Sequence, residues 1–287
     1  MSFFKTLILF FFAAWWLPCR IFRSNDMKKQ LILFAALSVT LTGCFQPPVR
    51  SMGATLMPAP VMHRSSPDSS ARELSVDASG FYGVTVENFN VEYVNALGGN
   101  LGVTYRMGGL LSPLFVNVAA GAFAGVLQFG CDESHGCGEG SKYNDWLMSH
   151  DGHQYYNFWN FQERALLGAD FRFGYLILGA AGGTQLYQGN SKYDDMREKL
   201  DDEGLVQNID EKCGYHWTSS IWLGSYLGRH GQYGNMVAEY DIFYKGGIAN
   251  ATGSIKWTYT HPSGFFGGFA RGNLIEFSLF AGKQFVF

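Results

Sequence analysis

Charged residues are scarce in this sequence. Asp, Glu, Lys and Arg make up 16% of its 287 residues, against roughly 25% in an ordinary soluble domain. Aromatic residues also reach 16%, and there are 36 glycines. Few charges with many glycines and aromatic residues are typical of an all-β protein with tight turns, or of a protein whose outer surface faces lipid.

Long hydrophobic runs are absent as well. The apolar runs at 6–17 and 31–41 are each about twelve residues long, whereas a helix needs about 20 to span a bilayer. The second run follows Met27-Lys28-Lys29 and precedes small residues, which is the layout of a secretory signal peptide. We therefore interpret residues 1–43 as an export segment, with either Met1 or Met27 as the true start.

Basic residues are few once this export segment is removed. Five of the 21 basic residues and one of the 24 acidic residues lie in 1–43, which leaves 16 against 23 and a formal net charge of −7. Nucleic acid attracts proteins through Lys and Arg contacts to its phosphates. The acidic balance therefore argues against nucleic acid as a partner.

The end of the export segment carries a short motif, Leu41-Thr42-Gly43-Cys44. It resembles the lipobox of bacterial lipoproteins. The resemblance implies a diacylglycerol on the Cys44 thiol, cleavage before Cys44, acylation of the new amino group with palmitate, and handling by the lipoprotein-processing machinery. Residue 45 is Phe rather than Asp, which favours sorting to the outer membrane.

The stretch after the lipobox changes in composition. Five of the eight prolines lie in 45–79, together with a group of serines. Such a composition is typical of an extended, weakly structured linker. The sequence thus predicts a lipidated flexible tether at 44–79, followed by a folded domain at 80–287.

From residue 80 onward apolar and polar residues alternate with period two, which indicates strands. The clearest segments are 101–106, 164–173, 237–244, 255–260 and 275–282. We predict an all-β fold, an antiparallel up-and-down transmembrane β-barrel of ten strands, with eight as the alternative. Residues 264–273 are too rich in glycine to assign.

Alternation alone fits either a soluble barrel with an apolar core or a membrane barrel with an apolar exterior. Two features favour the membrane. Aromatic residues lie near strand ends on the apolar faces, as interfacial girdles require. The polar faces hold charges of both signs that can pair in a narrow lumen: Arg106, Arg164, Asp170, Arg172, Glu239, Asp241, Lys256 and Glu276.

The last strand carries a second resemblance. Gly282, Phe285 and Phe287 match the C-terminal assembly signal of outer-membrane barrels, although Phe280 stands where a polar residue is usual. The resemblance implies recognition by the barrel-assembly machinery. Lys283 falls on the expected lipid face, close enough to the end of the strand to reach the interface.

Breaks between strands alternate between short and long. Short breaks lie near 107–113, 173–175, 228–234 and 261–264, and long ones at 130–157 and 188–213. Since outer-membrane barrels have short periplasmic turns and long external loops, we expect the N-terminus on the periplasmic side and the lipid anchor in the periplasmic leaflet. Both long loops are acidic, and 191–204 is expected to form one short helix.

Cysteines offer one candidate cross-link. Cys131 and Cys137 share a Gly-rich loop and form a possible disulfide, while Cys213 can instead pair with either. His135 between them lacks a fourth spaced ligand, so a zinc site is not favoured, and no metal or cofactor is predicted.

Catalytic motifs are missing. There is no nucleophile elbow and no His-Glu-x-x-His, and the run Ser149-His150-Asp151-Gly152-His153 is not a triad, because triads converge in space. His216 and His230 lie near strand ends. We expect an outer-membrane lipoprotein with a structural or interaction role. The alternatives are a soluble lipid-anchored periplasmic barrel that binds a small ligand, a narrow transport pore, or an enzyme that modifies envelope lipids.

Overall fold

The computed structural model describes residues 59–64, 70–84, 92–130, 153–191, 213–244, 251–272 and 277–287. Within these ranges, no helix is both long enough and apolar enough to cross a membrane. The expected helix at 191–204 and the expected disulfide between Cys131 and Cys137 lie outside the described residues, as does Cys44.

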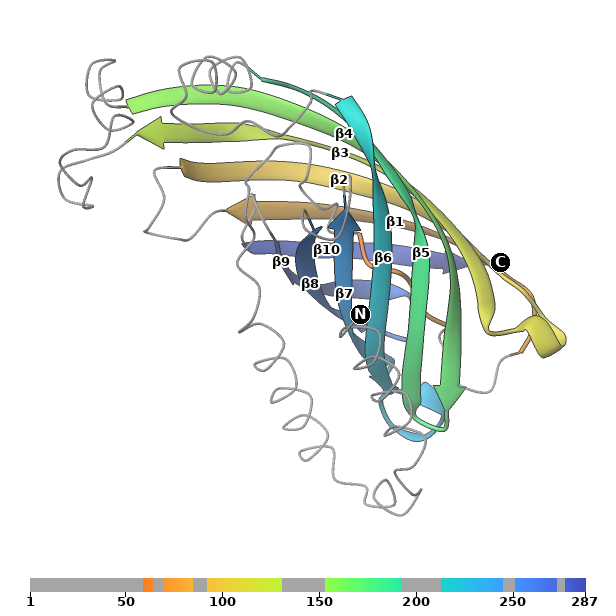
Figure 1. Ribbon diagram of the computed structural model, residues 1–287. Helices are drawn as coiled ribbons and strands as arrows, with labels where there is room; N and C mark the ends of the chain where they lie inside the picture. Colours follow the sequence, from red (N-terminus) through yellow and green to blue (C-terminus); the bar gives the residue numbers. More distant parts are fainter. Residues whose placement is uncertain are drawn as a thin grey trace. The chain divides into compact units, whose positions relative to one another are not determined.

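Ten antiparallel strands close into one barrel (Figure 1). Each strand pairs with its neighbours in sequence, and β10 pairs with β1 to complete the ring. The ten-strand, up-and-down prediction is therefore confirmed. The strands are β1 (Glu73–Val84), β2 (Glu92–Arg106), β3 (Leu114–Gly130), β4 (His153–Phe173), β5 (Leu176–Ser191), β6 (Cys213–Tyr226), β7 (Asn235–Tyr244), β8 (Ala251–Thr260), β9 (Phe265–Arg271) and β10 (Phe277–Val286).

The alternating pattern separates a polar interior from an apolar exterior. On β2, Leu101 is 63% exposed on the outer wall, whereas Arg106 is fully buried inside. On β4, Leu167 and Phe173 are each 62% exposed, whereas Arg164 is 1% exposed. An apolar wall around a polar interior is the arrangement of outer-membrane β-barrels.

The two longest connections, between β3 and β4 and between β5 and β6, lie at the same end of the barrel, as the sequence predicted, although the connection between β9 and β10 at that end is also short. Four short connections join β2 to β3, β4 to β5, β6 to β7 and β8 to β9. The tightest is the Gly174–Tyr175 turn, where Gly174 adopts a φ of +62° that suits glycine. These four connections lie at the opposite end of the barrel, which we call the short-turn end; the ends of β1 and β10 that carry Glu73 and Val286 lie there too.

The predicted boundary at residue 80 was wrong. The first strand begins at Glu73, because the alternation of inward polar and outward apolar residues already holds from there: Ser75 and Asp77 are buried inside, while Leu74 is 41% exposed. Residues 59–64, which we call the lumen segment, are also not a solvent-exposed tether. All six are buried.

Large inward side chains fill the lumen above glycines on neighbouring strands. A Cβ added at Gly168 would lie 2.5 Å from the ring of Phe115, and one at Gly179 would lie 2.4 Å from Trp222. Phe115 and Trp222 join the apolar core of the barrel, together with Val61 of the lumen segment and with Leu166, Ile177, Ala181, Tyr226 and Val237. This core lies toward the short-turn end.

Candidate functional site

The lumen segment lies inside the barrel toward its short-turn end and is held there by two groups of charged side chains. Ala59, Val61 and Met62 are each 1% exposed, and Arg64 is also 1% exposed. Burial of an extended segment requires partners for its backbone N–H and C=O groups, because an unpaired buried polar group is costly. The strands provide several of these partners.

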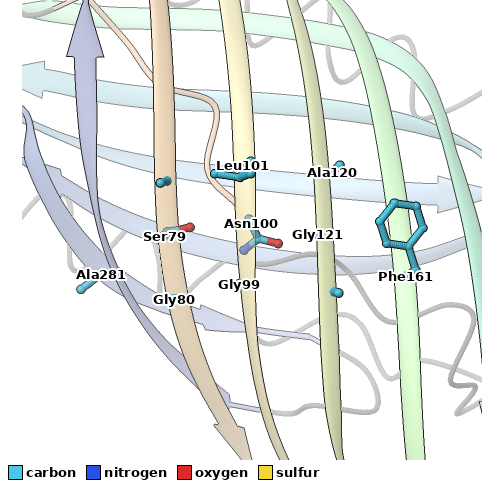
Figure 2. Close-up of a pocket in the computed structure, with 11 residues that line it drawn as sticks. Ser79, Gly80, Gly99, Asn100, Leu101, Ala120, Gly121, Phe161 and Ala281 are labelled. Carbon is cyan, nitrogen blue, oxygen red and sulfur yellow. The ribbon is translucent and has the colours of Figure 1, made fainter.

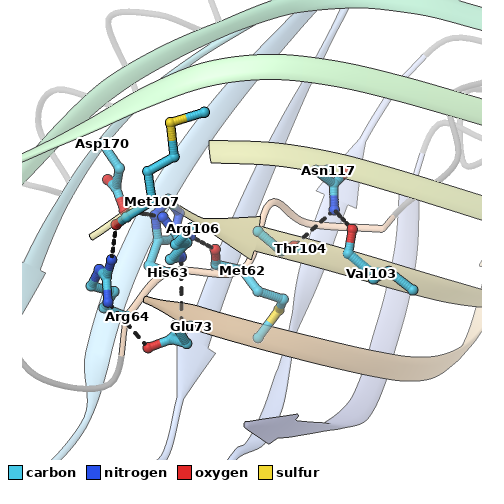
Figure 3. Close-up of polar contacts among 10 residues, drawn as sticks. All are labelled: Met62, His63, Arg64, Glu73, Val103, Thr104, Arg106, Met107, Asn117 and Asp170. Carbon is cyan, nitrogen blue, oxygen red and sulfur yellow. Dashed lines mark hydrogen bonds and ion pairs between the residues drawn. The ribbon is translucent and has the colours of Figure 1, made fainter. Parts of the chain in front are cut away.

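The first charged group centres on Asp170 of β4 (Figure 3). Its Oδ2 lies 3.2 Å from His63 Nδ1 and 3.2 Å from Arg106 Nη1. The indole Nε1 of Trp222 donates to its Oδ1 at 3.1 Å. One carboxylate thus connects β2, β4 and β6 to the lumen segment.

Glu73 extends this group to the first residue of the barrel. Its carboxylate lies 3.6 Å from Arg64 Nη1 and 3.6 Å from Arg106 Nε. Arg64 also donates to the carbonyl of Met107 at 3.0 Å, and Arg106 donates to the carbonyl of Met62. The guanidinium of Arg106 lies 5.0 Å from the ring centroid of Phe115, within cation–π range.

The second charged group centres on Lys256 of β8. Its ammonium nitrogen lies 3.0 Å from Glu239 Oε1 and 2.6 Å from Asp241 Oδ2, and it donates to the carbonyl of Ala59 at 2.9 Å. Arg164 donates to the same carbonyl at 3.1 Å.

A backbone bond from the lumen segment completes this group. The N–H of Val61 donates to Glu239 Oε2 at 3.0 Å, so Glu239 accepts a hydrogen bond from the segment and forms an ion pair with Lys256. Ser220 donates to Asp241 on the neighbouring strand.

The charges in these two groups balance. The acidic members are Glu73, Asp170, Glu239 and Asp241, and the basic members are Arg64, Arg106, Arg164 and Lys256. Paired buried charges cost far less than isolated ones. The short-turn end of the lumen is therefore filled by a cross-linked network of paired charges.

Farther from the short-turn end, uncharged side chains face inward, some of them polar and others aromatic, such as Phe123 and Phe158. Along β4, Asp170 and Arg164 are followed by Gln162 and Asn160, both 1% exposed. Gln185 of β5 donates to Gln162 at 3.0 Å. His216 stacks on Tyr187 with centroids 4.7 Å apart. Charge is thus concentrated where the lumen segment lies.

The predicted assembly-signal residues occupy both faces of β10. Phe285 is 49% exposed on the outer face of β10 and Phe287, 77% exposed, follows the strand, while a Cβ at Gly282 would lie 2.5 Å from the inward ring of Phe266. Phe280, at the position that departs from the pattern, is 4% exposed and faces the lumen. Lys283 donates to the carbonyl of Ser263 in a short turn, as expected for a side chain that reaches toward the interface.

The remaining predicted site residues do not converge in the described part of the chain. His216 lies near the start of β6 and His230 in the turn beyond its end, so the whole strand separates them. Cys213 is exposed with a free thiol. The described residues contain no group of His, Cys, Asp or Glu side chains suited to a metal. Ser149, His150 and Asp151 lie outside the described ranges.

The outer wall carries a shallow groove of about 560 Å³ (Figure 2). Its floor follows a row of register partners across four strands: Ala281, Gly80, Gly99 and Ala122. Leu101 and Phe161 border it, 63% and 39% exposed. The small side chains indent the apolar wall there.

The sequence reasoning missed the lumen segment altogether. Its apolar pair Val61-Met62, followed by His63-Arg64, stood inside a Pro- and Ser-rich stretch and gave no periodic pattern. One indirect indication of such a segment was present in the sequence. Many charged residues were predicted to face a narrow lumen, where they need partners.

Comparison with solved structures found chains with a similar fold. One of them, the translocator domain of the autotransporter NalP from Neisseria meningitidis, aligns with 10% sequence identity and a TM-score of 0.33, over 76% of this chain and 88% of that chain. No protein-family model matches the chain, and no curated protein matches it.

Proposed function

We propose that this protein is an outer-membrane lipoprotein with a closed barrel, and that its role in the cell envelope is structural or interactive rather than transport. The observation that carries the proposal is the network of ion pairs and backbone contacts around the lumen segment. A barrel blocked in this way presents surfaces and loops to partners and does not conduct solutes.

The strand number supports a closed barrel. Barrels of about eight strands have interiors that side chains mostly fill, and aqueous channels occur at about 16 strands. Here the lumen holds a further six residues of backbone in addition to large inward side chains, among them Phe115, Trp222 and Tyr226. A narrow transport pore would need this segment to leave.

The outer wall supports a lipid environment over the soluble alternative. Leu97, Leu101 and Leu279 are 67%, 63% and 55% exposed on the outside. Soluble monomers rarely expose contiguous apolar patches above a few hundred Å². A water-soluble barrel with these side chains outside would be prone to aggregation.

Acylation at Cys44 is part of the proposal and depends on the lipobox resemblance. The positions of the long connections in the sequence favour an anchor in the periplasmic leaflet, whereas the direction of the lumen segment favours the outer leaflet, as argued below. Outer-membrane lipids, the lipoprotein-processing machinery and the barrel-assembly machinery are the partners that this assignment implies.

The test combines fractionation, labelling and conductance. The protein should remain in outer membranes after alkaline carbonate extraction and should migrate differently before and after heating. Cys44→Ala should abolish labelling by a fatty-acid analogue, while Cys213→Ala, the matched control at an exposed thiol, should keep it. Steady ion conductance by the purified wild-type protein in a planar bilayer would contradict the closed barrel, and release by carbonate would contradict the membrane location.

A further inference from the structure

The lumen segment has a defined direction inside the barrel. Arg64, its last residue, contacts Glu73 at the beginning of β1 and the carbonyl of Met107 directly after β2. Both partners lie at the short-turn end. The C-terminal end of the segment is therefore at the mouth of the barrel where β1 begins.

The N-terminal end of the segment lies deeper. Val61 bonds to Glu239, four residues beyond Asn235 at the beginning of β7. Ala59 bonds to Lys256, four residues before Thr260 at the end of β8. Four residues of strand correspond to about 13 Å along the strand. Followed backward from Arg64, the chain thus runs away from the short-turn end.

The lower lumen is occupied on several sides of the segment. Contacts reach it from β1, β2, β4, β7 and β8, and Trp222 of β6 packs against His63 with centroids 5.4 Å apart. On the remaining side, Phe266 and Phe280 of β9 and β10 are buried inward. A second pass of chain back to the short-turn end would have to displace this packing.

Three of these contacts are hydrogen bonds to backbone carbonyls of the lumen segment rather than to its side chains. Arg106 donates to the carbonyl of Met62, and Arg164 and Lys256 both donate to the carbonyl of Ala59. Every residue carries a backbone carbonyl. Inward cations of this kind hold an extended chain along the barrel axis largely independently of its side chains.

We propose that the chain threads its own barrel, entering at the end with the long connections and leaving at the short-turn end, where β1 begins. The inference rests on the proposed function. In an outer-membrane barrel whose long connections face outward, it places the acylated terminus on the cell surface. The fourteen residues 45–58 reach at most about 50 Å when extended, which exceeds the roughly 25 Å apolar band of such barrels.

Single-cysteine labelling of the full-length protein in cells tests the threading. Cys131, Cys137 and Cys213 are changed to Ser, Cys44 is kept for acylation, and one new thiol is added at a time. Ser51→Cys reports on the chain before the lumen segment. Asp145→Cys reports on the long connection between β3 and β4, and Gln232→Cys, at an exposed position, reports on a short turn.

Intact cells are treated with a membrane-impermeant maleimide, before and after permeabilisation of the outer membrane. Threading predicts that Ser51→Cys is labelled in intact cells to the same extent as Asp145→Cys, while Gln232→Cys is labelled only after permeabilisation. Labelling of Ser51→Cys only after permeabilisation, or in neither state, would overturn the threading. If the two control positions do not separate, the proposed outer-membrane barrel itself fails.

Discussion

Replacing Lys256 by Met should destabilise the barrel far more than any comparable change outside. Lys256 is fully buried, with Glu239 and Asp241 at 3.0 and 2.6 Å. Methionine has a similar length and no charge, so Lys256→Met removes the cation without leaving a large cavity. Two buried carboxylates then lose the ammonium group that neutralises them, and the carbonyl of Ala59 loses one of its two donors.

The expected cost follows from this geometry. Two unit charges 3 Å apart attract by roughly 5 kcal/mol at an effective dielectric constant of about 20, before desolvation is subtracted. Removal of one partner from a buried pair typically costs about 3–5 kcal/mol, because the other charge is left without compensation. Since Lys256 serves two carboxylates, we expect the upper part of that range.

Urea unfolding of the folded protein in lipid vesicles, followed by the loss of heat-modifiable migration, measures the free energy of unfolding. Lys283→Met is the matched control, because Lys283 donates to the carbonyl of Ser263 and lies 3.9 Å from the centroid of the Phe265 ring, with no ion pair to any described residue. It should cost about 1 kcal/mol or less. Adding Glu239→Gln to Lys256→Met should recover part of the loss. Equal costs for the two lysine variants would refute the buried network.

Three further predictions concern the two faces of the barrel wall. Single cysteines at the odd positions of 255–260 should be quenched by lipid-borne labels and those at the even positions should not; aqueous reactivity of the even set without any lipid quenching would indicate a soluble barrel. Gly183→Ala should cost about 1–3 kcal/mol of unfolding free energy, because the new Cβ would lie 1.8 Å from a backbone oxygen. Gly182→Ala, whose Cβ would have its nearest atom at 4.0 Å, should be tolerated. Equal unfolding midpoints of the two variants would contradict this. Trp222→Phe should cost about 1.5–3 kcal/mol of unfolding free energy, because the hydrogen bond to the buried carboxylate of Asp170 is lost. Trp217→Phe, at an outward position that is 56% exposed, breaks no such bond and should cost less. Equal effects of the two changes in urea unfolding would argue against the hydrogen bond.

The strand faces were predictable because the side-chain period in a strand is two. A one-residue error in register would move every inward charge to the lipid face. On β7 the predicted inward positions Glu239 and Asp241 are 2% and 0% exposed. The alternation at such positions is clear because the inner face requires polar side chains and the outer face requires apolar ones.

Glycine-rich strands were harder to identify for a physical reason. Residues 264–273, left unassigned from the sequence, contain β9. A Cβ at Gly268 would lie 1.8 Å from the carbonyl of Trp257 and 2.8 Å from the ring of Phe280. Glycine is needed at this position because atoms of the neighbouring strands occupy the space of a side chain. Strand propensities, in which glycine is unfavourable, do not include such a requirement from another strand.

The lumen segment could not be found from periodicity, but its partners leave a trace in the sequence. Six residues held mainly through backbone groups impose no spacing on their own side chains. The strands that hold them do carry inward charges, and one of these, Arg164, donates to the segment's carbonyl at Ala59. Lys256 pairs with Glu239 and Asp241, so Arg164 beside this group has a donor available for a backbone carbonyl in the lumen. In a barrel too narrow to hold much water, an inward cation with donors left over indicates that a segment of chain outside the strands fills the interior.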